Sequence, residues 1–230
     1  MHKIKLSLGL LFVIVFFSPF LGGDLLYSDD SQSKNIISLN NITVTKIQKE
    51  IRIKAKLAIT EGILEYLLVG HQGKTYESVF KVIDNKPSEL NFALLLIGCK
   101  ALKFDSLLEL TNDPDGLEKL LKNHKESILE IDIIKDGKKV DMQSLMRNRE
   151  GSGNGLVWVY TEGVFIEKHG YAADLEFSYI GIWPDMVAVI NLFSTLKNPY
   201  GGDFGFEINK GNNELTVDQD FEILIRRYPS

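Results

Sequence analysis

The segment KPSELNFALLLIG, residues 86–98, constrains the fold more than any other part of the chain. Asp84 and Asn85, which precede it, are residues that cap helices; Pro87 suits a first helical turn, and Glu89 lies near the positive end of the helix dipole. Gly98 is a residue at which helices commonly stop. The positions between them are almost all apolar: Leu90, Phe92, Ala93, Leu94, Leu95, Leu96 and Ile97. We therefore predict a helix over about 87–98 that is buried nearly all round.

Strand patterns dominate the rest of the chain. Residues 51–59 alternate apolar and basic side chains, which is the period of a half-buried antiparallel strand. Residues 42–47 should pair with it as a hairpin, residues 63–69 and 75–83 should form another through GHQGK, and residues 127–142 should turn at Asp136 and Gly137. Further strand-like runs are 156–161, 163–168, 172–183, 186–192 and 220–227. The fold class predicted is α+β: a predominantly antiparallel β-sheet with one buried helix (about 87–98) and one or two short amphipathic helices, including residues 115–123.

The N-terminus has the layout of an export signal. Lys3 and Lys5 precede an apolar run from Leu6 to Phe17, and small residues follow at Gly22 and Gly23. We predict a signal peptide over residues 1–23, a flexible polar linker over 24–40 and one α+β domain over 41–230. The alternative is an uncleaved segment that stays as an anchor, which would be the only contact with a membrane. The expected location is the periplasm or cell envelope of a bacterium.

Charge and cysteine content exclude several kinds of function. The net charge is −5, and removal of residues 1–23 takes away two lysines and no acidic residue, which moves it to −7. A protein of this charge is a poor partner for nucleic acid. A single cysteine, Cys99, allows no internal disulfide and no thiolate-based metal cluster, and at the end of an apolar helix it should be a buried small hydrophobe. We expect neither a metal nor a cofactor.

A weak catalytic constellation can be assembled from the strands. Glu65 and Glu77 share strand faces with apolar residues, so a suitable register would bring their carboxylates together on a half-buried surface beside Lys74 and His71. Such pairing separates the pKa values of two carboxyl groups and suits acid–base chemistry. A solvated sheet edge is the competing interpretation. The sequence WPD at 183–185 resembles the acid loop of tyrosine phosphatases, but Asp105 stands where that chemistry needs an arginine, six positions after Cys99.

Several stretches together resemble the uncharacterised exported bacterial proteins of the YdjY type. They are EGILEYLLV, GKTYESV, KPSELNFALLLIG, LVWVYTEG and GYAADLEF, and they span roughly residues 60–190. The positions that match the family pattern are Glu65, Lys74, Glu77, Pro87, Gly98, Trp158 and Asp174. Tyr76 stands where the family often has histidine, and 161–163 also departs from the pattern. The resemblance implies an exported protein and brings no established activity.

Two hypotheses of function remain open at this point. The first is a non-enzymatic binding or envelope-associated domain whose partner is a protein, a polymer or a small ligand of the cell envelope. The second is a hydrolase or acid–base enzyme that uses Glu77 with Lys74, Tyr76 or Asp174, and Glu65 completes this set of candidate catalytic residues. The enzyme hypothesis requires at least three of these groups to converge on one concave site with a perturbed carboxyl pKa.

Overall fold

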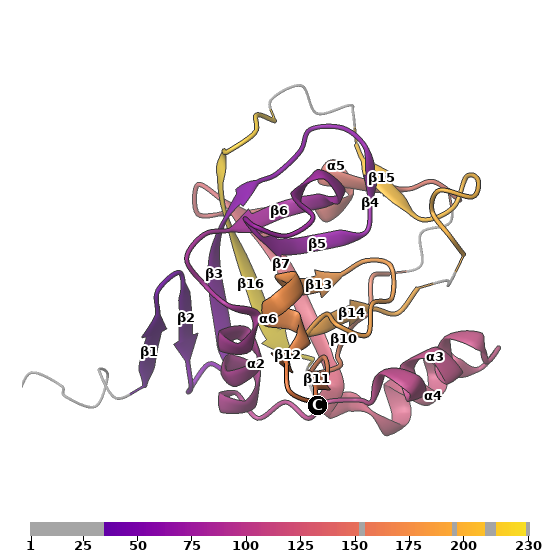
Figure 1. Ribbon diagram of the computed structural model, residues 1–230, viewed down its shortest axis with the longest axis horizontal. Helices are drawn as coiled ribbons and strands as arrows, with labels where there is room; N and C mark the ends of the chain where they lie inside the picture. Colours follow the sequence, from indigo (N-terminus) through magenta and orange to yellow (C-terminus); the bar gives the residue numbers. More distant parts are fainter. Residues whose placement is uncertain (1–34, 152–154, 195–196, 210–214, 229–230) are drawn as a thin grey trace, which may run out of the picture.

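The computed structural model describes residues 35–151, 155–194, 197–209 and 215–228 (Figure 1). The predicted signal peptide, 1–23, and the larger part of the predicted linker, 24–40, lie outside the described residues. The first described element is β1 (Ile36–Leu39), which pairs with β2 (Ile42–Thr45). Folded structure therefore begins inside the segment that composition marked as linker, before residue 41.

A mixed, eight-stranded β-barrel organises the fold. Around it the strands follow the order β3 (Glu50–Leu57), β16 (Asp220–Arg227), β7 (Ile128–Lys135), β10 (Trp158–Tyr160), β14 (Ile190–Leu192), β13 (Ser178–Gly181), β5 (Tyr66–Gly70) and β6 (Ser78–Val82). β6 pairs back onto β3 at Leu57 and Phe80, which closes the barrel. The β5–β6 and β13–β14 pairs are parallel, and the other neighbours in the barrel are antiparallel.

The α+β class is confirmed, but the sheet is mixed, and the hairpin predicted between 63–69 and 75–83 is wrong. β5 and β6 run parallel, with Tyr66 opposite Ser78 and Gly70 opposite Val82. The glycines of GHQGK do not form a tight turn; they allow the backbone to pass close to the side chain of Phe177. A Cβ at Gly70 would lie 2.9 Å from the Cβ of Phe177, and one at Gly73 would lie 3.0 Å from it. The chain therefore returns beneath Phe177, through η1 (Thr75–Glu77), before β6 begins.

Shorter strands extend the barrel or lie beside it. β1 and β2 continue the sheet from β3, and β8 (Lys138–Val140) pairs with β7 through a turn in which Asp136 and Gly137 have positive φ. That turn confirms the predicted hairpin. A separate sheet joins β4 (Ile63–Leu64), β15 (Phe206–Ile208) and β9 (Met146–Asn148), and β11 (Phe165–Ile166) pairs with β12 (Gly170–Tyr171).

The alternating strands place most of their buried apolar side chains in one large core. A smaller cluster packs Leu107 of α3 and Leu120 of α4 against Ile128 and Val159 of the barrel. In β3 the side chains of Ile51, Ile53, Ala55 and Leu57 are buried, whereas Lys54 is exposed, as the sequence pattern predicted. Ile53 lies opposite Ile223 of β16, which in turn lies opposite Ile133 of β7. The largest fully buried side chains of this core are aromatic: Trp158, Tyr160, Tyr179 and Phe80.

Three helices pack on the barrel: α2 (Pro87–Leu96), α3 (Phe104–Asn112) and α4 (Gly116–Asn123). α2 agrees with the predicted helix, and Gly98 beyond it has a φ of +80°. α4 agrees with the predicted amphipathic helix at 115–123, whereas no helix was predicted over the residues of α3. Two shorter helices are α5 (Met142–Leu145) and α6 (Ala172–Glu176), and η2 (Lys125–Ser127) precedes β7. α6 occupies the start of a segment predicted as a strand.

The prediction that α2 is buried nearly all round is wrong. Leu90, Ala93 and Leu94 are fully buried, but Phe92 is 49% exposed and Leu95 52% exposed. The reason is the position of the helix: α2 contacts β2, β13 and α6 on the outside of the barrel, so only one of its faces meets other elements. A uniformly apolar sequence gives no sign of which face that is.

This difference between the two faces can be measured with two substitutions in one turn of α2. Leu94→Ala should lower the free energy of unfolding by about 2–5 kcal/mol, because it opens a cavity in a fully buried site. Leu95→Ala, whose side chain is half exposed, should change it by about 0.5 kcal/mol or less. Urea denaturation of both variants provides the comparison. Equal losses at the two positions would contradict the observed orientation of the helix.

Candidate functional site

Parallel pairing of β5 and β6 brings Glu65 and Glu77 side by side. Each residue directly precedes its strand, and the Glu65 amide donates a 2.9 Å hydrogen bond to the carbonyl of Glu77. Because the strands run in the same direction and in this register, both carboxylates lie at the same end of the barrel wall. The sequence suggested the meeting of these two groups, although through a hairpin that does not form.

Lys74 places an ammonium group in contact with both carboxylates. Its Nζ lies 3.2 Å from Oε2 of Glu65 and 4.0 Å from Oε2 of Glu77. The same ammonium lies 5.6 Å from the centre of the Tyr66 ring. Glu65 is only 8% exposed, and Oε2 of Glu77 is buried without a hydrogen-bond partner among the described residues. We call Glu65, Lys74 and Glu77 the carboxylate cluster; its formal charge is negative.

Burial perturbs the protonation of this cluster. Loss of solvent raises the pKa of Glu65; the hydrogen bond from Lys74 lowers it, and the nearby Glu77 raises it, with a net rise. Burial lowers the pKa of Lys74, but the hydrogen bond and charge of Glu65 and the charge of Glu77 outweigh that effect and leave it raised. The cluster therefore favours a proton on the carboxyl side and keeps its ammonium charged.

Tyr200 is a neighbour of the cluster that sequence patterns did not reveal. Burial raises its pKa above the usual value, and a hydrogen bond with Glu77 and the charge of that carboxylate add to the rise. Tyr200 is 123 positions away along the chain from Glu77, in a segment without strand or helix. No local pattern could join the two residues.

The other candidate residues lie elsewhere. Tyr76 is 66% exposed and is not a member of the cluster. Asp174, on α6, accepts hydrogen bonds from the Ser88 amide at 2.7 Å and from the Ser88 hydroxyl at 2.8 Å. It thus caps the first turn of α2, where a negative charge stabilises the helix dipole. His71 is exposed and contacts Gln72. Of the predicted set, the structure brings together Glu65, Lys74 and Glu77.

A buried hydrogen-bond network adjoins the cluster through Tyr66. Its hydroxyl donates to Oδ2 of Asp185 at 3.0 Å, and Oδ1 of Asp185 accepts from the Val187 amide at 2.9 Å. The Asp185 amide in turn donates to Oδ1 of Asn191, a fully buried residue, at 2.8 Å. The aspartate of the WPD sequence is therefore a structural acceptor that fixes the β13–β14 connection.

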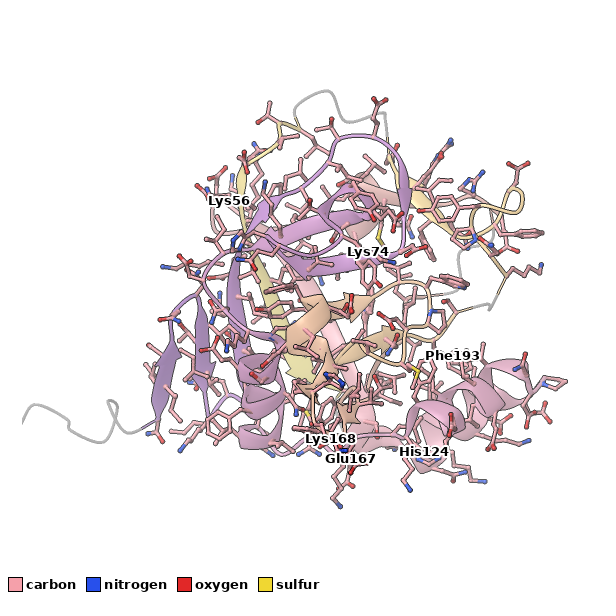
Figure 2. The ribbon with its side chains drawn as sticks, viewed as in Figure 1. Lys56, Lys74, His124, Glu167, Lys168 and Phe193 are labelled. Carbon is pink, nitrogen blue, oxygen red and sulfur yellow. The ribbon has the colours of Figure 1, made fainter. Side chains whose placement is uncertain are left out.

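A cleft of about 410 Å³ lies beside these elements. It is bounded by the end of α3, the turn into α4, the strand ends of β10 and β14, and the β9–β15 region. Its apolar lining comes from Leu64, Leu117, Ile182, Trp183, Phe193 and Phe206. Its polar lining includes Asn112, Asp113, Asn148, Glu150 and Lys197. Figure 2 labels Phe193 of the cleft and Lys74 of the carboxylate cluster, which lie apart in that view. Glu65, Lys74 and Glu77 are not among the residues that line this cleft.

Two features of the cleft concern its polar groups. Nζ of Lys197 lies 3.2 Å from Oε1 of Glu150 and 4.5 Å from the ring centre of Phe204. Nε1 of Trp183 is buried and has no acceptor among the described residues, which costs the free protein a hydrogen bond. A second hollow, of about 450 Å³, lies along β7 and β8. Of the carboxylates that line it, Glu130, Asp132 and Asp141, Asp132 is paired with Arg226 and Lys139 at 2.5 Å each.

Comparisons with known proteins add no relative: a scan against protein-family models, a search of curated proteins and a search of solved structures each find no match. Among the described residues, no group of three or more His, Cys, Asp or Glu side chains could hold a metal ion. None of the helices in the described ranges has both the length and the hydropathy needed to cross a bilayer. Cys99 is buried, and burial raises the pKa of its thiol to about 12.

The raised pKa of Glu65 gives a pH-dependent stability. Folding disfavours its ionised form, so the wild-type chain should lose stability relative to Glu65→Gln as the pH rises through the pKa of the folded state. Below about pH 4, the usual range for a free glutamate, the carboxyl is protonated in both folded and unfolded chains, so the stability difference between the two proteins should no longer change with pH. Melting temperatures of both proteins between acid and neutral pH test this expectation.

The matched control for this comparison is Glu109→Gln, which alters an exposed carboxyl on α3. The control removes the same charge without touching the carboxylate cluster. If the melting temperature of the wild type instead rose relative to that of Glu65→Gln toward neutral pH, a raised pKa for Glu65 would be contradicted.

Proposed function

We propose that this chain is an exported bacterial protein whose α+β domain binds a small ligand or a polymer of the cell envelope without catalysing a reaction. The signal-like N-terminus and the resemblance to the exported YdjY-type family support the location. The cleft beside β10, β14 and β15 supports the binding role. Its volume of about 410 Å³ lies in the range of small-ligand sites.

The observation that carries this proposal is the two-sided chemistry of the cleft. One part of the lining is apolar and aromatic, with Trp183, Phe193 and Phe206, and the other presents amides, carboxylates and an ammonium. Ligand sites typically combine an apolar surface with a few polar groups that fix orientation.

The lining also suits a polymer with both ring faces and hydroxyl groups, such as an envelope glycan. Aromatic side chains bury the apolar face of a ligand, while Asn112, Asn148 and Glu150 offer donors and acceptors for its polar edge. Because the cleft is open to solvent, a polymer chain can extend beyond it, and the site does not have to enclose the whole ligand.

The chain contains two tryptophans, which makes the cleft directly observable. Trp183 lines the cleft, and Trp158 is buried in the barrel with 1% exposure. Soluble glycan fragments released from a bacterial cell wall should shift the indole N–H resonance of Trp183 in a ¹⁵N-resolved spectrum and leave that of Trp158 in place. The Trp183→Phe variant assigns the two signals. No shift of Trp183 with fragments at millimolar concentration would count against the proposal, and equal shifts of both signals would indicate a global change.

A second candidate function is acid–base catalysis by the carboxylate cluster. The observation that favours it is the convergence of Glu65, Lys74 and Glu77, with a raised pKa at Glu65. A carboxyl that holds its proton beside an ionised carboxylate is the arrangement that separates a general acid from a general base. Tyr76 and Asp174 have no part in this version of the enzyme hypothesis, because one is exposed and the other caps α2.

The catalytic version predicts a clear pattern of loss. With p-nitrophenyl glycosides and esters as probes, Glu77→Gln should abolish any turnover, because it removes the second carboxylate of the cluster while preserving shape. Tyr76→Phe is the matched control, since that exposed ring is the chain neighbour of Glu77 and should leave turnover intact. Measured melting temperatures should stay close to wild type for both. Activity that survives Glu77→Gln would remove the cluster from consideration as a catalytic site.

A further inference from the structure

Three adjoining elements expose large apolar side chains. They are Phe92 (49% exposed) and Leu95 (52%) on α2, Phe165 (78%) on β11, and Leu175 (51%) on α6. We call these four residues the apolar face; Ile166 (45% exposed) follows Phe165 in the strand and points to its opposite side. Single exposed apolar residues are ordinary on a protein surface, but a group of them on adjoining elements marks an interaction site.

The three elements are fixed against one another. α2 and α6 are in contact, and Asp174 of α6 binds Ser88 of α2. The Ala172 amide at the start of α6 donates to the carbonyl of Val164, next to β11, at 2.9 Å. The Phe165 ring lies 5.0 Å from the ring of Tyr171, centre to centre. Figure 1 shows α2, α6 and the β11–β12 hairpin as neighbours, so the exposed side chains sit on a common rigid base.

The way the chain enters the fold shows what this face can meet. In Figure 1 the start of β1, the last turn of α2 and the β11–β12 hairpin lie toward the same edge of the molecule. Residues 6–17, upstream of β1, form the longest apolar run of the N-terminal segment. Residues 18–34 can span at most about 61 Å when fully extended. An N-terminal segment held in a bilayer would therefore keep the apolar face within reach of the same bilayer.

The polar surroundings are compatible with lipid headgroups. Lys86 and Lys168 are exposed on the segments that bound the apolar face, and Figure 2 places Lys168 at the lower edge. Lys100 is also exposed there, but its ammonium is paired with Glu126 at 2.7 Å. Lysine stems can lie along an apolar surface while the ammonium reaches phosphate. Glu167 stands beside Lys168, so charge is mixed and apolar contact is the main attraction.

We propose that the apolar face inserts into the surface of a lipid bilayer, so that the folded domain lies on the membrane and does not only hang from an N-terminal segment. Phe165, the most exposed of the four, penetrates deepest, and the α2 side chains follow. Each large side chain that passes from water into the acyl boundary adds buried apolar area, which strengthens binding to the bilayer. This inference rests on the envelope location in the proposed function, but not on the cleft.

The single cysteine makes a residue-level test practical. Cys99 is buried with a raised pKa, so a new exposed cysteine can be labelled selectively. The full chain carrying Phe165→Cys is labelled with the environment-sensitive fluorophore NBD and mixed with vesicles of phosphatidylcholine whose acyl chains are brominated. We expect an emission increase and quenching by the bromines several-fold greater than for the control variant.

The control variant is Val217→Cys, labelled in the same way. Val217 is 50% exposed. The amide of its neighbour Asp218 donates a hydrogen bond to the carbonyl of Leu57, the last residue of β3. Val217 therefore lies at the end of β3 that is far from the β2–β3 turn. Both labels report whether the chain is on the vesicle, but only position 165 should enter the lipid. A second labelled variant, Phe92→Cys, should behave like position 165.

Four outcomes would overturn the proposal, and the first three concern the vesicles. They are no quenching at position 165 while the chain co-sediments with vesicles, equal quenching at positions 165 and 217, and no association with vesicles at all. Self-quenching of the label at 165 that grows with protein concentration without lipid would show that a second copy covers the face, which also overturns it. None of these readouts depends on Trp183 or on a cleft ligand, so failure here and failure of the ligand-binding proposal are distinguishable.

Discussion

The pairing of β6 onto β3 is the constraint on which the rest of the fold depends. One edge of β3 is taken by β16 along nearly its whole length, and the other is shared: β2 pairs with its first half and β6 with Lys56 and Leu57. This division closes the barrel and diverts β1 and β2 out of it. It also fixes where η1 presents Glu77 and where α2 leaves the wall, so both the carboxylate cluster and the apolar face follow from one pairing.

The carboxylate cluster is unfavourable as a purely structural device. Two carboxylates share one ammonium, and Oε2 of Glu77 is buried without a hydrogen bond among the described residues. Apolar side chains of similar volume often stabilise such sites more than an ion pair does. The network of Tyr66, Asp185 and Asn191 next to it is different, because each of its hydrogen bonds is made. The contrast makes the cluster, and not the network, the site where chemistry beyond structure can be sought.

Sequence patterns could predict the elements whose signals are local. The alternation of 51–59, the run 220–227, the Asp136–Gly137 turn and the Pro87 and Gly98 boundaries all became the expected elements. Local patterns could not predict which strands pair with one another, or in which direction. Periodicity states which face of a strand is buried but not the direction of its neighbour, so the parallel β5–β6 pair was missed. The glycines at 70 and 73 resembled turn residues, although they are needed for contact with Phe177. Tyr200 joins Glu77 only through tertiary structure.

The wrong prediction for the burial of α2 has the same physical origin as the apolar face itself. Seven apolar positions between Leu90 and Ile97 exceed what one contact face of a helix can bury, because a helix on a barrel shields only part of its circumference. Sequence reasoning resolved the excess by burying the helix completely, whereas the fold leaves Phe92 and Leu95 in the open. Apolar side chains exposed to water carry an unfavourable hydration free energy, which is removed if an apolar neighbour covers the outer face of α2. The composition of α2 therefore argues for a second environment on its outer side, which a lipid surface provides without any change in the barrel.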